Sequence, residues 1–195
     1  MTSTVVADWF GEKFASLHPL LQALHTQGGT LRGQVLIDIP SGVGGLIGRR
    51  LAQKLGVPSA GGTHQLVVHI SHEAGQLHWN RCFNNTAEMK STFEPVGTIT
   101  YGYWLERTGP LAVRVTVDII EGGWHWRCLS LHFMGIALPL FLFPKSRAYK
   151  IIESEKYRFY VGFSLPVLGT VLSYSGLLVA ELGGCPVIEF SCLNA

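Results

Sequence analysis

An arginine stands between two large aromatic residues in the stretch "HWNRCF", residues 78–83. In a strand, Trp79, Arg81 and Phe83 lie on the same face because alternate side chains point the same way. A guanidinium in that setting can stack on the rings or bind a carboxylate inside a cavity. Alternatively, the arginine reaches solvent at an exposed sheet edge. The sequence supports both interpretations equally.

Further candidate groups for acid–base chemistry are scattered along the chain. Glu106 is a candidate buried partner of Arg81, although a surface pair with the adjacent Arg107 is the simpler interpretation. If the protein is an enzyme, the candidate acid–base residues are Glu106, Glu153, His125 and Tyr174. The sequence contains no nucleophile elbow, H-E-x-x-H or P-loop motif, so the catalytic residues stay unassigned.

Two patterns that suggest a metal or a nucleotide are incomplete. His69-x-x-His72 would place its two rings on opposite faces of a strand, so we predict no metal site. The segment "SGVGGLIGRR" (41–50) follows a strand-like run but has isoleucine where the dinucleotide motif needs its third glycine. We therefore predict no cofactor there, but a strand-to-helix turn with Arg49 and Arg50 in water. The residues expected to pack on the sheet are Leu46, Ile47, Leu51 and Leu55.

The composition describes a chain that is poor in charge and rich in apolar residues. Hydrophobic residues make up 47% of the 195 residues and charged residues 14%, against roughly 25% charged in an average domain. The net charge of +2 is too small to indicate a nucleic-acid partner. No signal peptide or C-x-x-C pair is evident, which favours a cytoplasmic protein with free thiols.

Short, turn-bounded runs dominate the chain after Pro58. Their alternating apolar residues indicate antiparallel strands with one solvent-exposed face. The uncharged stretch 159–180 is interrupted by Pro166 and glycines, so we interpret it as two strands and not as a membrane span. We predict one domain over 1–195, with two helices within 4–56 and an antiparallel β region at 61–190. The expected fold class is α+β, a curved, mostly antiparallel sheet or partial barrel with the two N-terminal helices packed on it.

The apolar run 133–144 contains Pro139 and Pro144, which exclude a central strand. It could form a lid over a cavity, a segment packed on the core, or an interaction surface.

Several stretches, in order, resemble an uncharacterised bacterial family of domains of unknown function. The similar pieces are "FASLHPLLQALH", "GRRLAQKLGVPSAG", "HWNRCF" with "MKS" after it, "LERTGPLAVRV", "GIALPLFLFP" and "YRFYVGFSLPVLGTVLSYSGLL". Members of that family occur alone or behind a saccharopine-dehydrogenase-like or epimerase-like NAD(P)-binding domain. The resemblance implies a single complete domain without the fused reductase, and it brings no activity or catalytic residues.

The functional hypothesis that these observations favour is a binding module with an apolar cavity for a small hydrophobic or lipid-like ligand. The alternatives are an enzyme, or an accessory domain that acts with a separate NAD(P)-dependent reductase and contacts it through 133–144. The candidate ligand-binding residues are Trp79, Arg81, Phe83, Glu106, Trp124, Trp126, Arg127, Phe159 and Tyr174, with Arg81 or Arg127 meeting a polar head group.

Overall fold

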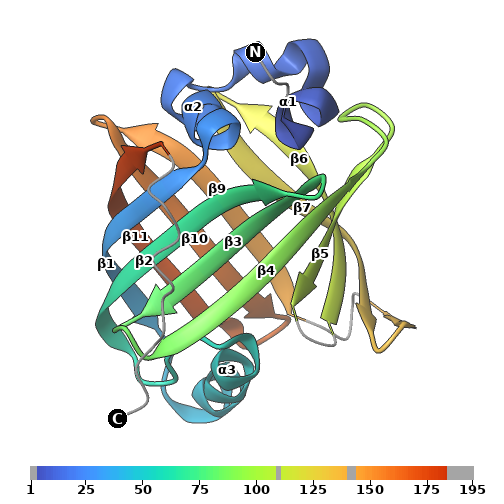
Figure 1. Ribbon diagram of the computed structural model, residues 1–195. Helices are drawn as coiled ribbons and strands as arrows, with labels where there is room; N and C mark the ends of the chain where they lie inside the picture. The colour runs from blue at the N-terminus through green and yellow to red at the C-terminus, as the bar shows by residue number, and fades with distance from the viewer. Residues whose placement is uncertain (1–3, 109–110, 140–143, 184–195) are drawn as a thin grey trace.

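In the residues that the computed structural model describes, 4–108, 111–139 and 144–183, the sheet has eleven strands, ten of which close into an antiparallel barrel (Figure 1). The helical elements are α1 (Val5–Phe10), the 3-10 helix η1 (Gly11–Ser16), α2 (Pro19–Gln27) and α3 (Gly42–Leu55). The strands are β1 (Gly29–Asp38), β2 (Gly62–Glu73), β3 (Gln76–Phe83), β4 (Ala87–Val96), β5 (Tyr103–Thr108), β6 (Leu111–Ile120), β7 (Gly123–Phe133), β8 (Ile136–Leu138), β9 (Lys145–Glu153), β10 (Lys156–Leu165) and β11 (Gly169–Leu182). No described helix is both long enough and apolar enough to cross a membrane.

The order of the strands shows why the expected fold class is wrong. The strands are paired in the order β6-β5-β4-β3-β2-β1-β11-β10-β9-β7, and β6 also pairs with β7. This last pairing closes the ring, while β8 extends from β7 alone. The structure is therefore a closed barrel and not a curved sheet or partial barrel of the α+β class. Closure gives all ten barrel strands a partner on both sides, which removes the free edges that an open sheet leaves.

Two-residue turns join four of the strand pairs, and a three-residue turn, 84–86, joins β3 to β4. Both residues have positive φ in the two-residue turns Ala74–Gly75, Glu121–Gly122, Met134–Gly135 and Ser154–Glu155. Positive φ at both positions is the type I′ geometry, whose twist matches that of the flanking strands. These tight turns hold neighbouring strands in register, so alternate side chains along each strand enter the barrel.

The N-terminal segment fills one end of the barrel (Figure 1). Trp9 and Phe10 are buried there, with Trp9 centred 5.4 Å from Trp104 and Phe10 4.7 Å from Trp124. The backbone N–H of Ile99, in the β4–β5 turn, donates to the Trp9 carbonyl at 2.9 Å. The helices α1 and α2 thus form an apolar plug, which is a different role from packing on the outside of a sheet.

Helix α3 lies at the opposite end, where it packs against the start of β11 through glycines (Figure 1). A Cβ atom on Gly48 would lie 1.9 Å from the Val171 carbonyl oxygen, so only glycine allows this approach. The expectation that Leu46 packs on the sheet is wrong, because 60% of that side chain is exposed. Leu51 and Leu55 do pack against the core, and Arg49 and Arg50 are exposed.

Candidate functional site

A cavity of about 150 Å³ lies inside the barrel, on the side of the aromatic plug that faces α3. Its wall includes side chains from most of the barrel strands and Leu55 of α3. Most of them are apolar, as expected from alternate residues on the inner face of a barrel. A cavity of about this volume holds a molecule of roughly the size of benzene, well below the 300–1,000 Å³ of drug-sized sites.

Arg81 is the permanently charged group of this cavity. It projects inward from β3 and is only 9% exposed. Its Nη1 donates to Ser91 Oγ of β4 at 3.0 Å, and its guanidinium lies 5.2 Å from the centre of the Trp79 ring. Ser91 is its one hydrogen-bond partner among the residues that the structure describes. A guanidinium carries five N–H donors, so further donors of Arg81 are available to a ligand.

Glu106 faces the same part of the cavity from β5. Burial raises the pKa of its carboxyl, while the charge of Arg81 and a hydrogen bond from Ser91 act in the opposite direction. The carboxyl therefore retains its proton to a higher pH than an exposed glutamate does. Arg81 and Glu106 are consequently joined through the Ser91 hydroxyl.

Lys150 and His25 form a second polar centre, against the aromatic plug. Lys150 of β9 is 1% exposed, and its Nζ lies 2.9 Å from Nε2 of the fully buried His25 in α2. Burial, and then the charge of Arg81, lower the pKa of Lys150 well below its usual value. Burial and Lys150 likewise lower the pKa of His25. The two groups therefore favour a shared neutral state with one hydrogen bond between them.

Two tyrosines complete the polar lining of the cavity. Burial raises the pKa of both Tyr157 and Tyr174, and in both cases the charge of Arg81 opposes that effect. Both side chains are therefore neutral hydroxyls at physiological pH. The indole Nε1 of Trp79, which also lines the cavity, has no hydrogen-bond partner among the described residues. A ligand in the cavity thus meets uncharged donors as well as the Arg81 cation.

The structure gathers most of the residues that the sequence proposed for ligand binding. Those that line the cavity are Trp79, Arg81, Glu106, Trp126, Phe159 and Tyr174.

The other three lie elsewhere in the molecule. Phe83 packs at the edge of Tyr174, and Trp124 packs on Phe10 in the plug. Arg127 is on the outside of the barrel, where its Nε donates to Asp118 at 3.1 Å. Of the two arginines considered for a polar head group, Arg81 is therefore the one that faces the cavity.

Sequence reasoning missed Lys150, His25, Ser91 and Tyr157. Lys150 carried a usable signal, because Ala148 and Ile152 flank it at two-residue spacing, so the alternation places the lysine among inward-facing residues. His25 had no such signal, since its partner is 125 residues away. Among the acid–base candidates, Glu106 and Tyr174 both line the cavity, whereas the exposed Glu153 binds Arg158.

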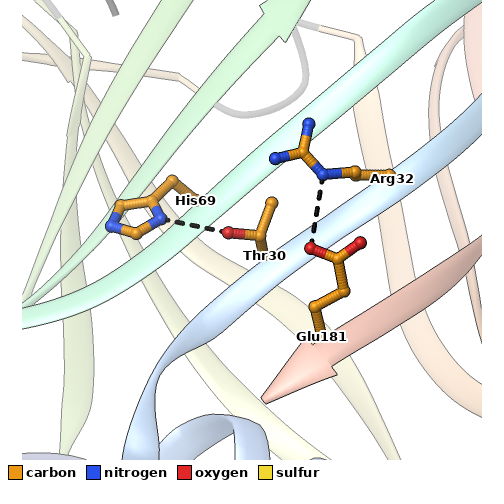
Figure 2. Close-up of polar contacts among 4 residues, drawn as sticks. All are labelled: Thr30, Arg32, His69 and Glu181. Atoms are coloured by element: carbon orange, nitrogen blue, oxygen red, sulfur yellow. Dashed lines mark hydrogen bonds and ion pairs between the residues drawn. The ribbon is translucent and has the colours of Figure 1, made fainter. Parts of the chain in front are cut away.

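The outer face of the seam between β1 and its neighbours carries polar pairs (Figure 2). His69 Nδ1 lies 3.4 Å from Thr30 Oγ1, and Arg32 Nε donates to Glu181 at 3.4 Å. His72 lies at an even position of β2, like the residues of that strand that face the barrel interior, and burial lowers its pKa. The two histidines of the H-x-x-H pattern therefore lie on opposite faces. Within the described ranges, no three His, Cys, Asp or Glu side chains form a group that could hold a metal ion.

The apolar run 133–144, for which the sequence left a lid, a core segment and an interaction surface open, lies partly outside the described residues. Phe133, Met134 and Ile136 are exposed around the β7–β8 turn, and residues 140–143 lie outside the described ranges. Cys185 and Cys192 also lie outside them, while Cys82 and Cys128 form no disulfide within the described residues.

Comparison with known families identifies one match. The model of a domain of unknown function, DUF4166, matches residues 17–178. Because this range includes most of the 195 residues, the chain belongs to the DUF4166 family. No curated protein and no solved structure matches it significantly.

Proposed function

We propose that this DUF4166 domain binds one small, largely apolar molecule whose carboxylate contacts Arg81 inside the barrel. The observation that carries the proposal is a buried arginine in the wall of a largely apolar cavity. A buried charge is costly unless it is paired. The hydrogen-bond partner of Arg81 is the neutral Ser91 hydroxyl, and the Glu106 carboxyl, whose pKa is raised, is joined to it through that hydroxyl. A ligand carboxylate would supply the opposite charge and accept two parallel hydrogen bonds from the guanidinium.

The charges around the cavity favour an anion over a cation. Arginine stays protonated at all physiological pH values. The Glu106 carboxyl has a raised pKa, and it is already hydrogen-bonded to Ser91. Arg81 is therefore the stronger electrostatic feature that a ligand meets, and it attracts negative charge.

The dimensions of the cavity limit the ligand. A volume of about 150 Å³ suits one aromatic ring or a chain of about six carbons. Longer acyl chains would have to displace wall side chains or extend toward α3. The ligand class is thus a short apolar carboxylic acid, smaller than the lipids that the composition alone suggested.

Binding of matched acids and alcohols tests this proposal. Benzoate and hexanoate are titrated against benzyl alcohol and hexanol, with calorimetry and tryptophan fluorescence as readouts. A hydrogen bond to a charged group contributes about 1.5–3 kcal/mol, so each acid should bind roughly 10- to 150-fold more tightly than its alcohol. Arg81→Gln should remove that preference. Arg127→Gln, which removes an exposed arginine of the same barrel, should leave it unchanged.

Equal affinity for acids and alcohols in the wild-type protein would contradict the proposed role of Arg81. Absence of binding by every probe would contradict the binding function itself.

A second candidate function, docking to a partner protein such as an NAD(P)-dependent reductase, is favoured by one observation. Phe133, Met134 and Ile136 are exposed together around the β7–β8 turn. Exposed apolar clusters of this kind are typical of interaction surfaces. Co-elution of the domain with a purified reductase, and its loss in Met134→Ser with Ile136→Ser, would be the expected result. Separate elution at micromolar concentrations would argue against it.

A further inference from the structure

Lys150 is the only buried lysine among the six of the chain. Lys13, Lys54, Lys90, Lys145 and Lys156 are all exposed. Lys150 instead lines the cavity with 1% of its surface accessible. Carboxylate binding at Arg81 makes no use of this amine, so its position needs another explanation.

Aromatic rings and an imidazole surround the amine. Nζ lies 3.7 Å from the centre of the Trp124 ring and 4.0 Å from that of Trp79, with Nε2 of His25 at 2.9 Å. The ring faces attract an ammonium ion. Burial and the Arg81 cation oppose the charge and together lower the pKa of the lysine well below its usual value. A desolvated amine near another cation is the setting in which lysine becomes a nucleophile at neutral pH.

We propose that Nζ of Lys150 binds a small apolar aldehyde or ketone covalently, as an imine, inside the barrel. This inference rests on the proposed function, because it places the ligand in the same cavity and adds a carbonyl group to its chemistry. A ligand with both a carbonyl and a carboxylate, an oxo acid, would engage Lys150 and Arg81 together.

The chemical step balances without an oxidant or a reductant. The lone pair of neutral Nζ attacks the carbonyl carbon, and the electrons of the C=O π bond move to the oxygen. A proton passes from Nζ to that oxygen and gives a carbinolamine. The nitrogen lone pair then forms the C=N bond as the hydroxyl leaves with a second proton, so one amine and one carbonyl yield one imine and one water. His25 Nε2, at 2.9 Å, is placed to accept the Nζ proton and to return it to the leaving oxygen.

Reductive trapping tests the inference on the full chain. Benzaldehyde or hexanal is added below the concentration of protein, sodium cyanoborohydride reduces the imine, and peptide mapping by mass spectrometry assigns the label. Because the lowered pKa leaves more of this amine neutral at pH 7, we expect the label on Lys150 to exceed that on each exposed lysine severalfold. A distribution that follows exposure would overturn the proposal.

Variants separate imine formation from packing. Lys150→Arg keeps a long basic side chain between the tryptophans but cannot form an imine, so it should lose the selective label. Lys156→Met, which removes an exposed lysine of the same barrel, should retain it. His25→Gln should slow the labelling of Lys150 and leave that of Lys156 unchanged. The wild-type peptide map decides the question even if the Lys150 variant does not fold.

The two proposals fail in different ways. If benzoate binds and Lys150 takes no more label than the surface lysines, the imine is refuted and carboxylate binding stands. If Lys150 is labelled selectively and no acid binds, the role of Arg81 is refuted and the amine chemistry stands.

Discussion

Gly48 and Gly44 of α3 form a matched pair of positions at which the same substitution should have opposite effects. An alanine Cβ at position 48 would lie 1.9 Å from the Val171 carbonyl oxygen, where real contacts are not shorter than 3.0 Å. The helix must therefore move by at least the difference, 1.1 Å. At position 44 the nearest atoms would be 3.6 Å and 3.7 Å away, an ordinary contact.

The expected free energies follow from these distances. Overpacking costs about 1–3 kcal/mol, and replacing glycine by alanine inside a helix returns up to about 1 kcal/mol. Gly48→Ala should therefore lower the free energy of unfolding by about 1–2 kcal/mol, whereas Gly44→Ala should raise it by about 0.5–1 kcal/mol. At about 2–4 °C per kcal/mol for a chain of this size, the two midpoints should differ by roughly 3–12 °C.

Urea unfolding followed by circular dichroism, with thermal melts beside it, measures both variants. Equal shifts for Gly48→Ala and Gly44→Ala would refute the reasoning, because helix propensity would then outweigh the contact with β11. A Gly48→Ala protein as stable as the wild type would show that α3 can move away from the barrel at no cost.

Three further predictions concern charge. The pKa of Lys150 is lowered in the folded protein, so between that pKa and pH 9.5 the lysine is protonated only in the unfolded chain. The free energy of unfolding should therefore rise with pH in this interval, by up to about 1.4 kcal/mol per pH unit. Urea titrations of Lys150→Met should show a smaller slope. Stability should fall as the pH drops below 6.5, since the folded state keeps His25 neutral while the unfolded state protonates it; a His25→Leu protein should lose less stability over the same range. Arg127→Gln should leave the unfolding free energy almost unchanged, because its ion pair with Asp118 is exposed to solvent; a clear loss of stability in the same urea titrations would contradict this.

The strands and several turns could be predicted from the sequence because their signals are local. Alternation in β6 and the glycine of Glu121–Gly122 are visible within a dozen residues. The run 149–163, in contrast, contains a turn at Ser154–Glu155 that divides it between β9 and β10. Both turn residues have positive φ without being glycine or asparagine, so composition gave no turn signal there.

Closure of the barrel and the Lys150 centre depend on pairings that no local pattern contains. Alternation shows that a strand has an inner face, but it does not show that β6 pairs with β7 while β1 pairs with β11. Leu46 looked like part of the packing face of α3, yet Gly48 makes the contact with β11 there, because the Val171 carbonyl approaches closely. The Arg81 cluster could be predicted in part from the sequence, since alternate residues of β3 lie on one face and these include Trp79 and Arg81.

The pairing of β1 with β11 also determines when the chain can fold. Gly29 lies opposite Leu182 and Asp38 opposite Ser173, so the seam joins the first and last strands of the barrel. Contacts of such high sequence separation place this domain among slow folders, with times of about milliseconds to seconds. During synthesis one edge of β1 has no strand partner until β11 has been made, and the inner face of the growing sheet is exposed to solvent until the two strands pair. The barrel can therefore close only after β11, the last of its strands in chain order, has been synthesised.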